Sequence, residues 1–156
     1  MAFAPAGCVI ATSGADGAVL LWNVGTGERV GAPLVGHTAT VWSVAFSPDG
    51  GKPATAGADA TVRLYDPESG LRIGEPLTGH APPVYDVAFS PDGTLPASVG
   101  EDGMTLLRDA ESGQPVGSPL AGHDGSVNSL AFSPDGSLLV TAGRDGALNR
   151  WLVGPL

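Results

Sequence analysis

Three kinds of side chain that act together in hydrolysis recur along this chain: a histidine, a Ser or Thr hydroxyl and an aspartate. One set contains the groups of a nucleophile, base and orienter triad, and similar sets stand 43 residues before and after it. A hydrolase needs its nucleophile once, with a sharp turn or an oxyanion hole beside it. The three sets are His37, Thr55 and Asp59; His80, Ser98 and Asp102; and His123, Thr141 and Asp145. Their repetition favours a structural role, and we expect the chain not to be an enzyme.

Other site chemistry does not fit the sequence either. The three histidines lie 43 residues apart, whereas metal ligands normally cluster at short spacings. Each Asp-Gly turn carries one carboxylate, fewer than a calcium loop needs. The glycine-rich segments lack the lysine of a phosphate-binding loop. We therefore expect no metal and no cofactor.

The chain contains an internal repeat with a period of 43 residues, which is typical of a repeat architecture. Gly-His occurs at 36–37, 79–80 and 122–123, and Phe-Ser-Pro-Asp-Gly occurs at 46–50, 89–93 and 132–136. A degraded fourth copy, Phe-Ala-Pro-Ala-Gly, begins at Phe3, and a turn aspartate recurs at Asp16, Asp59, Asp102 and Asp145. The expected repeats span approximately 1–35, 36–78, 79–121 and 122–156, of which the first and last are partial.

Each repeat is predicted to form four short antiparallel strands. The first strands, at 41–46, 84–89 and 127–132, are rich in valine and aromatic residues. They end at Ser-Pro-Asp-Gly, where proline presets φ and glycine accepts positive φ, so this segment closes a hairpin. A second strand leads to the Asp turn, and the third covers residues such as 18–22 and 61–65. The Glu-Ser-Gly turns at 68–70 and 111–113 then lead into a fourth strand. The expected fold class is all-β.

Gly-His, the Asp turn and a tryptophan that ends the third strand together resemble the WD40 repeat family, over essentially the whole chain. The Trp-Asp pair of that family falls at Trp22-Asn23, Tyr65-Asp66, Arg108-Asp109 and Trp151-Leu152, so it is incomplete in several copies. The resemblance implies a β-propeller of about four four-stranded blades, with the first and last incomplete. It also implies a buried hydrogen-bonded network in each blade, because buried polar groups must be paired. Carried over, the networks are His37/Thr55/Asp59/Tyr65, His80/Ser98/Asp102 with Arg108, and His123/Thr141/Asp145/Trp151.

Exposed positions that differ between the copies are free to serve a partner. One such register reads Trp42, Tyr85 and Asn128, and another contains Glu101 and Arg144. Both are expected on one rim around the central channel, where the resembled family commonly holds partners, and Trp and Tyr are good anchors there. The alternative is that both aromatic residues pack between blades, since such side chains are more often buried. Glu101 and Arg144 would then be ordinary solvated turn residues.

Three residues depart from the repeat in ways that should weaken it. Arg108 replaces an indole donor with a cation, and we expect it to contact Glu101 or Asp109 or to extend into solvent. Pro53 and Pro96 each remove a backbone donor, so their strands should start late or pair poorly. The middle two blades are therefore expected to be less stable than the last.

Charge and composition favour proteins as partners. The net charge is −9, and the seven basic residues are scattered, which suits neither nucleic acid nor an anionic membrane. The sequence has no apolar run of the roughly 18 residues that would span a membrane, and Cys8 is the only cysteine. We expect a cytoplasmic protein, and the excess of arginine over lysine hints at a bacterial source. The expected function is a protein-binding scaffold; the alternative is a regulatory or sensory segment of a larger signalling enzyme, linked to a kinase or an NTPase.

The chain has 156 residues, fewer than four full repeats would need. An incomplete arc would expose blade faces and strand edges. We therefore expect either a homodimer that assembles toward an eight-bladed ring, or further repeats of a longer chain.

Overall fold

A computed structural model describes residues 1–154, whose strands form four antiparallel sheets in chain order. Blade 1 contains β1 (Ala2–Phe3), β2 (Val9–Ser13), β3 (Val19–Asn23) and β4 (Arg29–Leu34). Blade 2 contains β5 (Val41–Phe46), β6 (Pro53–Gly57), β7 (Val62–Tyr65) and β8 (Arg72–Leu77). Blade 3 contains β9 (Val84–Phe89), β10 (Pro96–Gly100), β11 (Met104–Leu107) and β12 (Leu120–Ala121). Blade 4 contains β13 (Val127–Phe132), β14 (Leu138–Gly143) and β15 (Leu148–Leu152). The all-β prediction is confirmed; residues 155–156 of the expected last repeat lie outside the described part.

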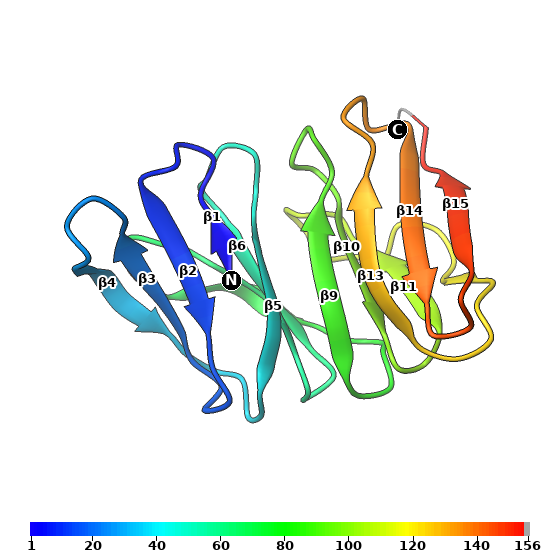
Figure 1. Cartoon of the computed structure of the whole chain (residues 1–156), viewed down its shortest axis with the longest axis horizontal. Coiled ribbons are helices and arrows are strands. Elements are labelled where there is room, and N and C mark those ends of the chain that lie inside the picture. The colour runs from blue at the N-terminus through cyan, green and yellow to red at the C-terminus, as the bar shows by residue number, and fades with distance from the viewer. Residues whose placement is uncertain (155–156) are drawn as a thin grey trace.

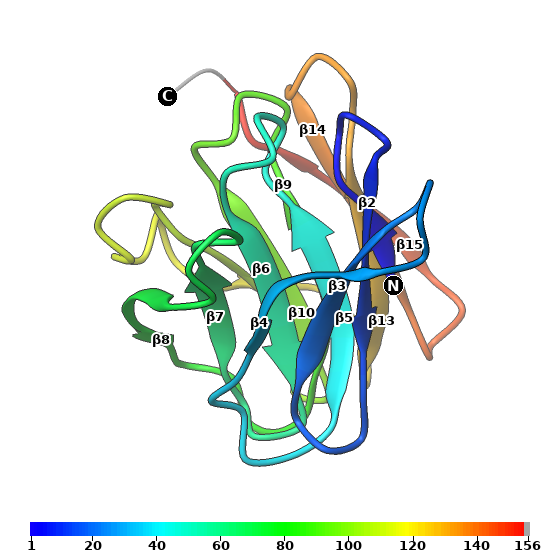
Figure 2. The ribbon, with the colours of Figure 1, turned by 90° about the vertical axis from the view of Figure 1, so that its left-hand side faces the viewer.

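The four blades follow one another across the molecule as an arc. Figure 1 shows β4 and β3 on one side and β14 and β15 on the other. The first strands of the blades are neighbours, with β5 beside β9 and β9 beside β13. Viewed from the side of blade 1, the later blades lie behind it (Figure 2). Closure of the arc into a ring is not seen among the described residues. Within residues 1–154, no helix is long and apolar enough to cross a membrane.

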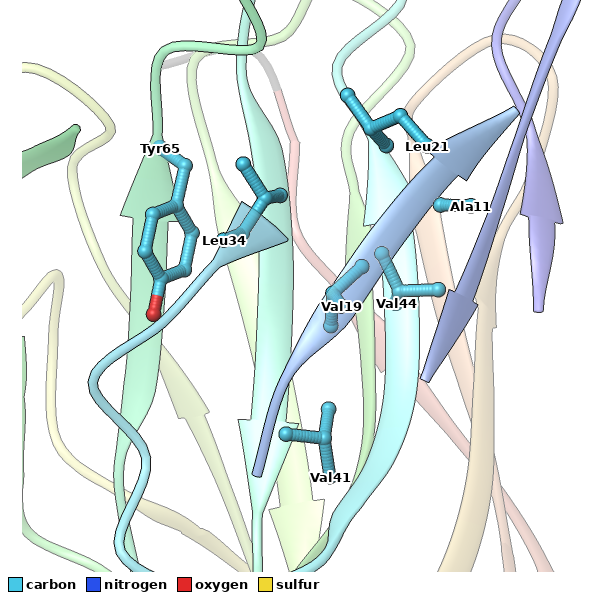
Figure 3. Packing of buried hydrophobic residues seen from close by; sticks show 7 residues of the cluster. All are labelled: Ala11, Val19, Leu21, Leu34, Val41, Val44 and Tyr65. Carbon is cyan, nitrogen blue, oxygen red and sulfur yellow. The ribbon is translucent and has the colours of Figure 1, made fainter. Parts of the chain in front are cut away.

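The hydrophobic core lies between successive blades as three clusters. Figure 3 shows the cluster between blades 1 and 2, made of Ala11, Val19, Leu21, Leu34, Val41, Val44 and Tyr65. Each middle blade is covered on both faces, so every residue of β6 and β10 is buried. These strands use small residues, Pro-Ala-Thr-Ala-Gly and Pro-Ala-Ser-Val-Gly, which lets the neighbouring sheets pack closely. The core therefore holds one blade to the next.

Pro53 and Pro96 shorten the pairing of β6 and β10 with the third strand of their blades, as expected. β6 begins at Pro53 and β10 at Pro96, and both still pair with the first strand of their blade. Toward the third strand, however, blades 2 and 3 have three residue pairs, whereas blades 1 and 4 have five. The carbonyl of Pro96 accepts from the N–H of Arg108 at 3.0 Å. The backbone nitrogen of Pro96 faces Arg108 as well, but proline has no N–H, so the return hydrogen bond cannot form. In the repeat register β6 and β10 begin one residue later than β2 and β14, and they pair over fewer residues with the third strand, so the prediction of a late start or poor pairing is confirmed.

The fourth strand of blade 3 is shorter than those of blades 1 and 2. β4 and β8 each have six residues, whereas β12 has two. Pro115 stands where β4 and β8 begin with Arg29 and Arg72. It forms an isolated bridge with Arg108 and has no N–H to extend the ladder.

Candidate functional site

The recurring histidine, hydroxyl and aspartate meet in blades 2, 3 and 4. The histidine Nδ1 lies 3.0 Å from Asp59 for His37, 2.9 Å from Asp102 for His80 and 3.1 Å from Asp145 for His123. Nε2 lies 2.6 Å from the hydroxyl of Thr55, 2.9 Å from that of Ser98 and 2.8 Å from that of Thr141. In a neutral ring bound to a carboxylate at Nδ1, Nδ1–H donates and Nε2 accepts the hydroxyl proton. All three hydroxyl residues are buried, so a substrate would not reach the one group that resembles a nucleophile.

Each aspartate also holds the backbone of the loop that carries its histidine. The Asp59 carboxylate accepts from the N–H groups of Thr38 and Thr61, and Arg63 Nη2 lies 3.8 Å away. Burial raises the pKa of Asp59, but hydrogen bonds from Thr61, His37 and Thr38 outweigh burial and bring the pKa to about 2. Burial lowers the pKa of His37, against the raising effect of Asp59. An ionised aspartate beside a neutral histidine therefore joins the loop to the blade.

Tryptophan completes this network only in the last blade. Trp151 Nε1 donates to the Thr141 hydroxyl at 3.0 Å, so that oxygen links the indole to the histidine of blade 4. In blade 1, Trp22 Nε1 donates to the equivalent Thr12 at 2.8 Å. Tyr65 of blade 2 donates its hydroxyl to the carbonyl of Val35 at 3.1 Å, and the Thr55 side chain is near enough to oppose the rise in the pKa of Tyr65 that burial causes.

Arg108 holds the loop of blade 3 in the way that Tyr65 holds that of blade 2. Its Nη2 donates to the carbonyl of Thr78, which is 43 residues after the carbonyl that Tyr65 contacts. No ion pair joins Arg108 to Glu101 or Asp109 in the described part of the chain, so the expected acidic contact was wrong. The backbone carbonyl accepts from one of the five guanidinium N–H groups, and burial lowers the pKa of Arg108.

The rim that carries the Gly-His loops and Asp turns, here called the histidine rim, displays the residues that differ between copies. Trp42, Tyr85 and Asn128 each occupy the extra position of a β-bulge. On β5, for example, Val41 pairs with Gly57 and Ser43 with Ala56, which leaves Trp42 unpaired. A bulge re-aims the side chain of its extra residue. Side chains of a regular strand point alternately to the two faces of the sheet. The bulge in each of the three blades therefore takes these three side chains out of that pattern.

Two of these side chains form an aromatic pair linked to an acid. The rings of Trp42 and Tyr85 meet edge-on, with centroids 6.3 Å apart and planes at 67°. Trp42 is 53% exposed, so it is not buried between blades, although its ring contacts the half-buried Tyr85 of the next blade. The Tyr85 hydroxyl donates to Glu101 Oε2 at 2.7 Å, and this bond raises the pKa of Tyr85. Glu101 is an exposed turn residue that also accepts this hydrogen bond.

The remaining two rim residues stay close to solvent. Asn128 is exposed, and its amide oxygen lies 3.4 Å from the Ser126 hydroxyl. Arg144 is exposed and makes no ion pair within residues 1–154. The described part of the chain also contains no group of three His, Cys, Asp or Glu side chains arranged to hold a metal ion.

Asp86 was not predicted, although it joins three blades. Its carboxylate accepts from the Ser43 hydroxyl on β5 at 2.6 Å and from the Ser129 hydroxyl on β13 at 3.2 Å. It also accepts from the N–H of Leu130 at 3.3 Å. The three side chains occupy equivalent positions, each 43 residues apart, one residue after the bulge. Comparison of the copies at this register would have shown the Ser, Asp, Ser alternation.

Comparisons with known proteins agree with this arrangement. The family model WD40, described as WD domain, G-beta repeat, matches residues 1–23, 28–66, 72–109 and 113–151. A search of curated proteins found no match. WD40 repeats are generally non-catalytic, and domains built from them generally bind proteins.

Proposed function

The chain belongs to the WD40 repeat family, and on this premise we propose that it is a non-catalytic scaffold that binds another protein at the histidine rim. The observation that carries the proposal is the exposure of Trp42, 53%, at a bulge beside Tyr85. Large aromatic side chains lose little rotamer freedom on binding and are enriched among the residues that dominate binding energy.

The exposed part of Trp42 is large enough to anchor a partner. An aromatic side chain buries roughly 150–250 Å² when fully covered, so covering the exposed half removes about 100 Å² from water. At roughly 25 cal/mol per Å², this contributes about 2–3 kcal/mol. Tyr85 supports the indole from the neighbouring blade, which reduces the ordering that binding requires.

Against catalysis stands the burial of each hydroxyl that a histidine contacts through Nε2. Thr55 and Thr141 are fully buried, and Ser98 is 6% exposed. Each hydroxyl faces a histidine whose other nitrogen is taken by aspartate. The same set in three blades serves the same structural need three times.

Affinity capture with the purified chain tests the proposal. Trp42→Ala and Tyr85→Ala should lose partners that the parent chain retains. Leu71→Ala is the matched control, because Leu71 is 69% exposed but lies on a turn at the other ends of the strands. Circular dichroism should show that all variants remain folded. Equal capture by the parent and both rim variants would refute binding at this rim.

A further inference from the structure

An acidic group lies beside the aromatic pair of the histidine rim, and it bears on the chemistry of the partner. Tyr85 contacts Trp42 through its ring and Glu101 through its hydroxyl, at 2.7 Å. The carboxylate and the exposed indole are therefore separated by one tyrosine side chain. Because Tyr85 is half-buried and holds both neighbours, the two groups present a fixed pair to solvent.

Three classes of partner side chain can be compared at this pair. An apolar side chain would cover the indole but strip water from Glu101 without replacing its hydrogen bonds, which is unfavourable. An acidic side chain would be repelled by Glu101 and by a chain of net charge −9. A basic side chain can lay its alkyl stem or guanidinium on the indole and donate to the carboxylate at the same time. Only the basic side chain satisfies both groups.

The charges around the pair leave Glu101 available for a cation from outside. Arg144 is close enough to lower the pKa of Tyr85 against the raising effect of Glu101, but no ion pair of Arg144 is found within residues 1–154. The turn and loop acids Asp16 and Asp124 are also exposed on this rim. In contrast, the carboxylates of Asp59, Asp102 and Asp145 are already occupied by histidines.

We propose that the histidine rim recognises an arginine or lysine on an extended segment of a partner protein, with the cation seated on Trp42 and against Glu101. This inference rests on the proposed function, and it adds the chemistry of the partner. Asp86 and the bulges position the site but do not contact the cation.

Nuclear magnetic resonance of the ¹⁵N-labelled full chain provides the test. The probe is a short Gly- and Ser-rich peptide with one central arginine. The matched peptides carry citrulline, which is neutral and nearly the same shape, or glutamate. The readout is the indole N–H resonance of Trp42. Trp22 and Trp151 serve as internal references, because their indoles donate to Thr12 and Thr141 inside the blades.

The arginine peptide should shift the Trp42 resonance saturably and leave the two reference resonances in place. The citrulline and glutamate peptides should bind about ten-fold more weakly or not at all, as loss of a charged contact of ordinary strength implies. Glu101→Gln should weaken the arginine peptide about three- to ten-fold without changing the affinity for citrulline. Arg144→Ala should strengthen the arginine peptide about two-fold, since it removes a like charge.

Equal affinities for the arginine and citrulline peptides would overturn the proposal, as would the absence of a Trp42 shift at about 5 mM peptide. The proposed function fails separately. Suppose that a protein is captured only when Trp42 is present and is captured equally well by Glu101→Gln. The scaffold function would then still hold, but the proposal that the rim recognises a cation would be refuted. A protein captured independently of both residues would remove both proposals.

Discussion

Asp86 offers a direct test of how the blades are held together. It lies on β9 in the middle of the arc and accepts hydrogen bonds from the blades on both sides, through Ser43 and Ser129. Replacing it with alanine removes these contacts while leaving the apolar clusters between the blades untouched. The change should therefore weaken the coupling between blades more than the structure of any single blade.

The distances set the expected size of the effect. A hydrogen bond to a charged group contributes about 1.5–3 kcal/mol. The 2.6 Å bond from Ser43 is short and should lie in that range, whereas the 3.2 Å bond from Ser129 is longer and more exposed. Allowing for water that replaces part of each bond at a half-exposed carboxylate, Asp86→Ala should lower the free energy of unfolding by about 2–3 kcal/mol.

Urea unfolding, followed by tryptophan fluorescence and by circular dichroism, measures this loss. In a repeat protein, weaker coupling between neighbours also broadens the transition, so Asp86→Ala should lower both the midpoint and the m-value. Asp92→Ala is the control, because Asp92 in the same blade bonds only within its own turn, to Ser90 and Thr94. It should lower the midpoint slightly and leave the m-value unchanged.

A double-mutant cycle isolates the link itself. Ser43→Ala and Asp86→Ala should be non-additive, with an interaction energy of about 1 kcal/mol or more, because they share one bond. If the two changes add within about 0.3 kcal/mol, or if Asp86→Ala costs no more than Asp92→Ala, then the carboxylate does not couple the blades and the reasoning is wrong.

Three further predictions concern stability and can be measured in the same way. Thr105→Val should raise the free energy of unfolding by about 1 kcal/mol, because the buried Thr105 hydroxyl has no hydrogen-bond partner in the described structure; a loss would show that the hydroxyl is paired. Gly143→Ala should destabilise by about 1–3 kcal/mol, because an added Cβ would press on His123 Nδ1 and lie 2.7 Å from Asp145 Oδ1, whereas Gly154→Ala meets nothing within 4 Å and should be neutral. Lowering the pH from 7.5 to 5.5 should reduce stability, because the folded state lowers the pKa of His37 from 6.5 and so disfavours the protonated ring; a variant with His37→Gln should show a smaller reduction. A second loss should appear as the pH falls from about 3.8 towards about 2, where the carboxylates of Asp59 and Asp145 take up protons.

The repeat predicts the network well because a constant period carries equivalent residues to equivalent places. His80, Ser98 and Asp102 lie far apart in the chain but meet within 2.9 Å at each link. Their spacing relative to the turns is the same as in the other blades, so one assignment served all of them. The first strands of blades 2 to 4 were likewise predicted with the observed bounds.

Contacts across the repeat are harder to predict, because they depend on which atoms happen to be within reach. Arg108 was expected to contact Glu101 or Asp109 or to extend into solvent. Its guanidinium instead donates to the carbonyl of Thr78 in the loop before His80. The tyrosine of blade 2 contacts the equivalent carbonyl, a position that no motif marks. The bulge at Trp42 is equally hidden, because it is a mismatch between two strands and not a property of one.

Differences between copies, which pointed to the rim, do not by themselves mark a binding surface. Ser43, Asp86 and Ser129 differ at one register, yet they serve the contact between blades. Their alternation suits the contact, because a carboxylate between two hydroxyls is a charged acceptor for both, whereas three carboxylates side by side would repel one another. Trp42 and Tyr85 also differ and also touch across blades. The two registers differ in exposure to solvent. The Asp86 carboxylate is hydrogen-bonded to the neighbouring blades, whereas 53% of Trp42 is exposed. The exposed surface, rather than the variation, therefore makes Trp42 the residue on which a test of binding should centre.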